Sequence, residues 1–111
     1  MDKINKLSQA IRLGIKFSPQ YFGGGYFNYD NKAEIIAACT LGRAILALGY
    51  TNDHKLLQRF PELESRQKHP VTGRKDQLHC IIVDLNDEYK WTSGKIADWL
   101  DRENRILKCL K

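Results

Sequence analysis

The hydrophobic residues at the start of the chain recur with the spacing of an amphipathic helix. Ile4, Leu7, Ile11 and Ile15 follow one another at steps of three or four residues, which places them on one face of a helix. We expect this helix to end near Ser18, because the residue before a proline is disfavoured in the helical region.

The segment after this helix is predicted to be a loop, over residues 19–31. Its three consecutive glycines, residues 23–25, oppose both helix and strand because glycine loses the most conformational freedom on folding. Aromatic side chains surround these glycines, which indicates either a stacking surface for a ligand or a surface loop anchored in the core. The aromatic residues are Tyr21, Phe22, Tyr26, Phe27 and Tyr29.

Residues 32–48 are apolar on almost every side, which predicts a central helix. Asn31 and Glu34 have the spacing of a capping box at its start, and Gly49 suits its C-terminal end. Gly42 within this segment indicates a close approach of another backbone, since glycine costs about 1 kcal/mol relative to alanine inside a helix.

The second half of the chain predicts further helices separated by an exposed connection. Asp53 begins a short helix that ends before Pro61, and residues 61–75 are predicted to form an exposed, basic connection with a turn. Residues 78–85 fit both a buried strand and a helical face; helix is favoured because no second strand is evident for pairing. Thr92 is expected to cap the last helix.

These elements predict a mostly α fold: a compact bundle of about four to five helices around the central apolar helix 32–48, with a short strand near 78–84 as the alternative. The length of 111 residues suits one helical domain, residues 1–111. Hydrophobic residues make up 42% of the chain and charged residues 28%, which is typical of globular proteins.

The sequence predicts a soluble, cytoplasmic protein. No apolar run approaches the roughly 20 residues that span a bilayer, so no membrane partner is expected, and the N-terminus lacks the features of a secretory signal. Three widely spaced cysteines, Cys39, Cys80 and Cys109, lie in apolar runs and are predicted to be free thiols.

Two stretches resemble a group of short uncharacterised bacterial and phage proteins. The N-terminal stretch carries Ile-Arg-Leu-Gly at residues 11–14 and Cys-Thr-Leu-Gly at 39–42. The C-terminal stretch carries Leu-Asn-Asp at 85–87, Trp-Thr at 91–92 and Ile-Ala-Asp-Trp-Leu at 96–100. The similarity covers about a third of the chain and departs from the group at residues 93–95. It implies a compact helical domain, and because no activity is assigned to the group it transfers no catalytic residue.

The net charge of +5 is concentrated in residues 55–75, where six basic side chains face two acidic ones. Such a stretch is either a solvated surface or a set of phosphate contacts. Together with the aromatic loop 21–29, it gives one candidate binding surface: Tyr21, Tyr26, Tyr29, Lys55, Arg59, Arg66, Lys68, Arg74 and Lys75.

Catalysis and metal binding have little support in the sequence. Three histidines and three cysteines show no spacing typical of zinc ligands, so no catalytic residue, cofactor or metal is predicted. The favoured function is a non-enzymatic binding or regulatory domain acting through protein contacts, with a homo-oligomer or a protein as partner. The alternative is a nucleic-acid-binding accessory protein that uses residues 55–75 and the loop 21–29.

Overall fold

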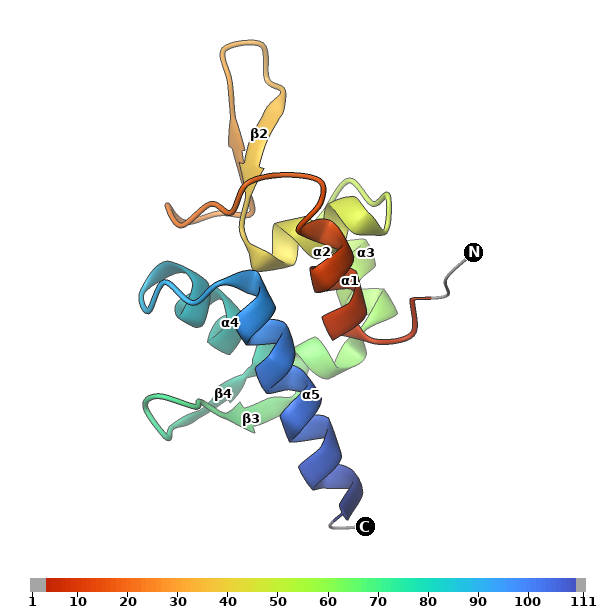
Figure 1. The fold of residues 1–111 in the computed structure, drawn as a ribbon, viewed down its shortest axis with the longest axis vertical. Helices are drawn as coiled ribbons and strands as arrows, with labels where there is room; N and C mark the ends of the chain where they lie inside the picture. Colours follow the sequence, from red (N-terminus) through yellow and green to blue (C-terminus); the bar gives the residue numbers. More distant parts are fainter. Residues whose placement is uncertain (1–3, 110–111) are drawn as a thin grey trace.

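The computed structural model describes the backbone of residues 4–109 and the side chains of residues 4–103. Over this range the chain forms five α-helices, one 3-10 helix and two antiparallel two-stranded sheets (Figure 1). The helices are α1 (Leu7–Gly14), α2 (Thr40–Ala47), α3 (Asp53–Arg59), α4 (Leu78–Asp87) and α5 (Ser93–Cys109), with the 3-10 helix η1 (Pro61–Glu64). The strands are β1 (Phe27–Tyr29), β2 (Ile35–Ala38), β3 (Arg66–Lys68) and β4 (Lys75–Gln77).

This architecture is a compact α+β fold with 48% helix, so the prediction of a mostly helical bundle is wrong. The helices supply the core, and α1 packs against both α2 and α5 while α2 also contacts α3 and α4. Burying each large aliphatic side chain contributes about 1.5–3 kcal/mol to stability. The fully buried aliphatic residues are Ile11, Leu41, Ile45, Leu56, Leu63, Ile81, Ile82, Leu85 and Ile96.

The predicted central helix over residues 32–48 forms only in its second half. Residues 35–38 are strand β2, paired antiparallel with β1, and Ile35 and Ile36 are 38% and 48% exposed. An apolar run of this length fits strand as well as helix, and its two adjacent β-branched residues favour the pleated conformation. The continuous apolar helix predicted for residues 32–48 is therefore absent from the described chain.

A side-chain turn at Asp30 replaces the predicted capping box. Its carboxylate accepts hydrogen bonds from the backbone N–H groups of Lys32 and Glu34, at 2.8 and 2.9 Å. Ala33 adopts a left-handed conformation with φ of 61°. The chain reverses direction at this turn, and β2 runs back antiparallel to β1. An aspartate that binds the backbone two residues ahead is a turn signal, not a helix start.

The start of α2 confirms the close approach predicted at Gly42. The Cys39 sulfur accepts a hydrogen bond from the Gly42 N–H at 3.4 Å, which places the helix start at Thr40. A Cβ atom on Gly42 would lie 2.3 Å from the carbonyl oxygen of Tyr26. That carbonyl also accepts the Cys39 N–H at 2.9 Å, so the base of the β1–β2 hairpin rests directly on the first turn of α2.

Residues 61–75 are more ordered than the predicted exposed connection. After η1 the chain forms β3, turns, and returns as β4, with Gln67 opposite Asp76 in the register. Leu63 is fully buried near the start of this segment and His69, at the turn between the strands, is 5% exposed, so the segment is fixed to the core at two points. Its basic side chains remain exposed.

The helical prediction for residues 78–85 is confirmed by α4, and the strand alternative is wrong. The predicted cap of the last helix is also confirmed, since the Thr92 hydroxyl accepts the Lys95 N–H at 3.2 Å. Within the described chain, no helix is both long enough and apolar enough to cross a membrane.

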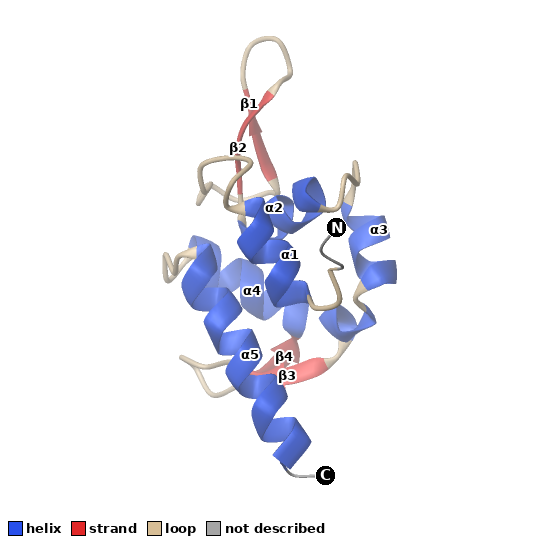
Figure 2. Cartoon of the chain, turned by 45° about the vertical axis from the view of Figure 1, so that its right-hand side comes forward, coloured by secondary structure: helices blue, strands red, loops and turns tan. Residues whose placement is uncertain are grey.

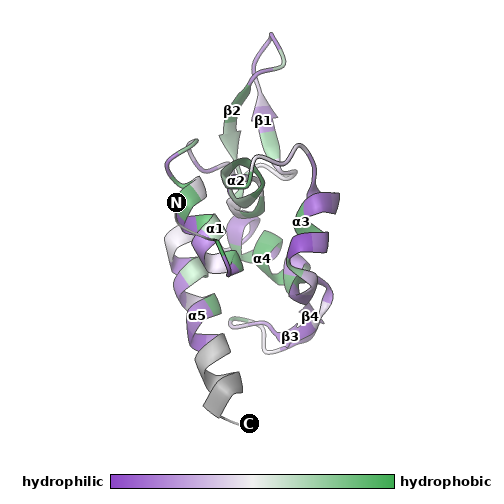
Figure 3. Ribbon diagram, turned by 90° about the vertical axis from the view of Figure 1, so that its right-hand side faces the viewer, coloured by the Kyte–Doolittle hydropathy of each residue, from purple (hydrophilic) through white to green (hydrophobic). Residues whose placement is uncertain are grey.

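The two hairpins lie at opposite ends of the molecule. In Figures 1 and 2 the β1–β2 hairpin projects beyond α2 at one end of the long axis, while β3 and β4 lie near the other end, beside α4 and α5. The long axis measures 49 Å. Colouring by hydropathy shows β2 on the hydrophobic side of the scale and β3 on the hydrophilic side (Figure 3).

The contact at Gly42 predicts opposite effects for the same substitution in two helices. Gly42→Ala is expected to lower the free energy of unfolding by about 2 kcal/mol, because its methyl group overpacks against the Tyr26 carbonyl. Gly94 lies in the first turn of α5, where an added Cβ would meet no atom from outside its own helical turn within 4 Å. Gly94→Ala is therefore expected to raise the free energy of unfolding by up to about 1 kcal/mol. Urea unfolding of the two variants tests this, and equal effects would contradict the close approach.

Candidate functional site

The structure does not bring the aromatic and basic candidate residues together. The tyrosines belong to the end of the molecule that carries β1 and β2, whereas the basic residues belong to α3 and the β3–β4 hairpin. The candidate residues therefore do not form one continuous surface.

The three tyrosines have different environments. Tyr21 is partly buried, and its ring packs so closely on Gly23 that a Cβ there would lie 2.6 Å from the Tyr21 hydroxyl oxygen. Tyr26 packs against the core, and burial together with the Asp53 carboxylate raises the pKa of Tyr26 to about 12. Only Tyr29 is strongly exposed, at 54%, on the projecting β1 strand.

The basic residues also divide into separate groups. Arg59 donates a hydrogen bond to the Ile4 carbonyl and lies over the Phe60 ring, while Lys55 is exposed nearby on α3. Alternation along the strands places Arg66, Lys68 and Lys75 together on one face of the β3–β4 ribbon. Arg74 points to the other face.

The face that carries Arg66, Lys68, Lys75 and Gln77 is called the outer face of the ribbon. Lys68 lies opposite Lys75, and Arg66 lies opposite Gln77. The flanking hydrogen bonds, from the His69 N–H to the Arg74 carbonyl and from the Leu78 N–H to the Ser65 carbonyl, make both of these non-hydrogen-bonded pairs. Opposite side chains come closest in such pairs, so the two lysine charges repel.

The inner face of the ribbon borders an open cavity of about 300 Å³, which is lined by Arg74 and Asp76 and by Cys80 and Asp84 of α4. A second open cavity of about 400 Å³ is lined by Cys80, Asp84 and other residues of α4 and its C-terminal end, and by no residue of the ribbon. Asp76 and Asp84 therefore lie on the inner side of the ribbon. None of the six residues of β3 and β4 supplies an acid to the outer face.

His69 fastens the turn of the ribbon to α4. Its Nδ1 accepts the backbone N–H groups of Val71 and Thr72, at 3.0 and 3.2 Å. Nδ1 therefore carries no proton, and Nε2–H donates to the Asp84 carboxylate at 2.7 Å. Both ring nitrogens are occupied by structural contacts, so this imidazole is not poised to act as a base.

The described thiols are not activated as nucleophiles. Burial raises the pKa of the Cys80 thiol, and the Asp76 carboxylate raises it further. Burial also raises the pKa of Cys39, against the backbone amides of Gly42 and Leu41, which lower it. Both cysteines are free, as predicted, and Cys109 lies outside the described side chains. Raised thiol pKa values favour the unreactive, protonated form.

The part of the chain whose side chains are described contains no group of three histidine, cysteine, aspartate or glutamate residues that could hold a metal ion. The cavities beside α4 thus offer acidic and thiol groups without a ligand set.

Asn86 lies at the centre of a buried polar network that the sequence did not predict. Asn86 is fully buried, and its Oδ1 accepts three hydrogen bonds: from Gln20 Nε2, the Thr40 N–H and the Thr40 hydroxyl, at 2.8, 3.0 and 2.8 Å. Its Nδ2 donates to the Tyr21 carbonyl and to Asp87 Oδ1, at 2.8 and 2.7 Å. The amide thus joins the loop before β1 to α2 and α4, with every donor satisfied.

The network has one possible direction of hydrogen bonding. Thr40 uses its only hydroxyl proton toward Asn86, so the Ser93 hydroxyl must donate to Thr40, at 3.0 Å. Ser93 in turn accepts from Arg43 Nη1 at 3.0 Å. Arg43 is 7% exposed, donates to the Ser18 carbonyl from Nε and Nη2, and burial lowers the pKa of its guanidinium.

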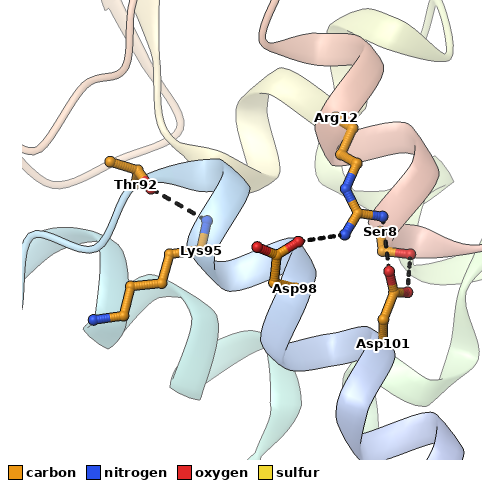
Figure 4. Close-up of polar contacts among 6 residues, drawn as sticks. All are labelled: Ser8, Arg12, Thr92, Lys95, Asp98 and Asp101. Atoms are coloured by element: carbon orange, nitrogen blue, oxygen red, sulfur yellow. Dashed lines mark hydrogen bonds and ion pairs between the residues drawn. The ribbon is translucent and has the colours of Figure 1, made fainter.

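An ion-pair cluster fixes α1 to α5 at the surface (Figure 4). Arg12 bridges Asp98 and Asp101 at 2.7 and 2.8 Å. Although burial raises the pKa of Asp101, hydrogen bonds from Ser8 and Arg12 outweigh it and lower that pKa below its ordinary value. Lys95, in the same view, points away and lies over the Trp91 ring.

No protein-family model, no curated protein and no solved structure matches this chain. The resemblance to short bacterial and phage proteins therefore stays a prediction.

The Asn86 network predicts a large loss of stability when the amide is removed. Asn86→Ala leaves the Thr40 N–H and the Tyr21 carbonyl buried and unpaired, and it is expected to cost about 3 kcal/mol in urea unfolding. Asn31→Ala, at an exposed asparagine, is the matched control and is expected to change stability by less than about 0.5 kcal/mol.

A second substitution at the same site adds a pH dependence. In Asn86→Asp, a carboxylate oxygen replaces the Nδ2 donor beside the Tyr21 carbonyl and Asp87, which raises the pKa of the new group in the folded state. A folded-state pKa above the unfolded value makes the variant lose stability as pH rises. Its deficit relative to the parent protein should be larger at pH 7 than at pH 5, and a pH-independent deficit would contradict the assigned network.

Proposed function

We propose that this chain is a non-enzymatic binding domain that associates with a second copy of itself through the β1–β2 hairpin. The observation that carries the proposal is the combination of apolar exposure and an unpaired strand edge on an element that projects from the core. Monomeric proteins normally protect such edges, because an open edge is a template for pairing with another chain.

Three of the seven exposed large hydrophobic residues among the described side chains lie on the hairpin. Tyr29, Ile35 and Ile36 are 54%, 38% and 48% exposed, and Phe27 contacts Tyr29 with ring centroids 6.1 Å apart. A two-stranded hairpin is marginally stable in water, and additional strands increase its stability. Pairing with a further strand would cover part of this surface.

The open edge belongs to β1. On β2, the outer edge is occupied at Ala38, which accepts the Tyr21 N–H and donates to the Pro19 carbonyl, at 2.9 and 3.0 Å. Within the described chain, β1 has β2 as its single neighbour. An added strand would therefore pair beside β1.

A second copy of β1 is the occupant that the chain itself best provides. Antiparallel pairing about a two-fold axis at Asn28 places Phe27 of each copy opposite Tyr29 of the other, which gives two aromatic cross-strand pairs. The strand contains no charged residue, and the turn beside it carries two acids and one base between Asp30 and Glu34. The cationic ribbon lies at the far end, so two hairpins can approach without opposing positive charge.

Self-association predicts a mass that depends on concentration. In sedimentation equilibrium the weight-average mass is expected to rise from 12.8 kDa toward twice that value as concentration increases. Tyr29→Lys is expected to remain monomeric over the same range, because a charge on an edge strand opposes pairing.

Val71→Lys is the matched control. Val71 is 47% exposed, close to the exposure of Tyr29, and the substitution adds the same charge at the opposite hairpin, so association should persist. The melting temperature of both variants establishes that they fold. A parent protein that stays monomeric at millimolar concentration, or a Val71→Lys variant that dissociates as fully as Tyr29→Lys, would overturn the proposal.

A further inference from the structure

We propose that the outer face of the β3–β4 ribbon binds duplex DNA through its phosphates, a role separate from the self-association proposed above. The juxtaposition that carries it is Lys68 directly opposite Lys75, with Arg66 beside them on the same face.

This arrangement lowers stability in the isolated protein. Like charges directly opposite one another on a sheet repel, and here they occupy a non-hydrogen-bonded pair, where side chains approach most closely. Asp76 alternates to the inner face, where it lines the cavity shared with Asp84. The three outer cations are therefore uncompensated within the ribbon, and an anionic partner supplies the missing charge.

The shape of the ribbon favours duplex DNA among anionic partners. A two-stranded antiparallel ribbon fits the major groove of B-form DNA, whereas the major groove of an A-form RNA helix is too narrow for it. Arg66 and Gln77 form an opposed pair at one end of the outer face, and guanidinium and amide groups are both common donors to phosphate oxygens.

The residues absent from the outer face argue against other partners. The six residues of β3 and β4 include no aromatic side chain, and stacking on aromatic rings is the main contact of proteins that bind single strands. They also include no apolar side chain for insertion into a lipid surface. The aromatic residues expected to help in nucleic-acid binding lie at the other end of the molecule.

The ribbon is held in a fixed position on the core. The His69 imidazole ties its turn to Asp84 on α4 at 2.7 Å, and the Leu78 N–H bonds the Ser65 carbonyl at 2.9 Å. Arg66 also donates to the carbonyl of Lys75 at 3.2 Å, which lays its side chain across the strands. The cations are thus presented on a preorganised element, which reduces the entropy lost on binding.

Fluorescence anisotropy with a labelled duplex DNA tests the proposal through its salt dependence. Three phosphate contacts predict that log K falls with log salt at a slope of about −2.7, so affinity drops about 40-fold between 50 and 200 mM salt. In Lys68→Gln/Lys75→Gln, one contact remains and the slope is expected to be about −0.9, a drop of about 3-fold. The parent protein and this double variant are measured at the same protein concentrations.

Lys16→Gln/Lys32→Gln is the matched control. Both lysines are exposed, lie outside the ribbon, and their substitution lowers the net charge by the same amount. This variant should keep the parent slope. A slope reduced equally in both double variants would show a diffuse charge effect and would overturn the site.

A second readout separates binding from folding. Lys75→Glu places a negative charge directly opposite Lys68. The melting temperature of this variant is expected to rise while its affinity for DNA falls. A variant that loses both stability and affinity would contradict the proposed repulsion.

Single-stranded DNA of the same sequence and vesicles containing phosphatidylserine are the competing probes. The proposal requires tighter binding to the duplex than to either. Absence of duplex binding at 50 mM salt, or stronger binding to the single strand or to the vesicles, would overturn it. Tyr29→Lys leaves the ribbon intact and should keep the parent slope per protomer, so failure of self-association and failure of DNA binding are distinguishable.

Discussion

The relative positions of the loop before β1, α2 and α4 depend on the fully buried amide of Asn86. Its oxygen accepts the Thr40 N–H at the start of α2 and the Gln20 amide from the loop before β1, and its nitrogen donates to the Tyr21 carbonyl. A buried polar group without partners would be costly, so these segments are stable only in the relative positions that satisfy it. Because Gln20 forms the β-bridge to Ala38 and Tyr21 donates its N–H to the Ala38 carbonyl, the same contact fixes the base of the β1–β2 hairpin.

The network extends from Asn86 to the buried guanidinium of Arg43, and its hydrogen bonds all run in one direction. Arg43 donates to the Ser93 hydroxyl, which donates to Thr40, which donates to Asn86. Among the residues whose side chains are described, Arg43 forms no salt bridge, and its charge is balanced by dipoles: the Ser18 carbonyl accepts two of its N–H groups. Chains of this kind polarise one another and specify a single arrangement of the segments they join. The start of α5 at Ser93 is therefore set by the same interactions as the start of α2.

The sequence predicted α1, α5 and the close approach at Gly42 from spacing and composition. Where a run fitted both the helical and the strand period, the outcome differed: residues 78–85 were assigned correctly to a helix because no partner strand was evident, and the assignment of residues 35–38 was wrong. Residues 35–38 were assigned to a helix because an apolar run on every side fits a buried helix as well as a strand, and the turn chemistry of Asp30 was not recognised. The basic stretch was identified correctly as a charged surface, but its division into two faces depends on the register of β3 with β4. Asn86 gave no local signal, since its partners other than the adjacent Asp87 lie 46 to 66 residues away.

The positions of the two hairpins have a consequence for how the proposed interactions would combine. Pairing two copies through β1 places their cationic ribbons at the far ends of the dimer, separated by up to roughly twice the 49 Å long axis of one copy. Adjacent half-sites on a straight duplex lie only about 34–36 Å apart, so such a dimer would span two separate stretches of DNA more readily than neighbouring major grooves. Its second contact would gain from effective concentration only when both stretches are within reach. This geometry favours bridging of DNA segments over recognition of a compact palindromic site.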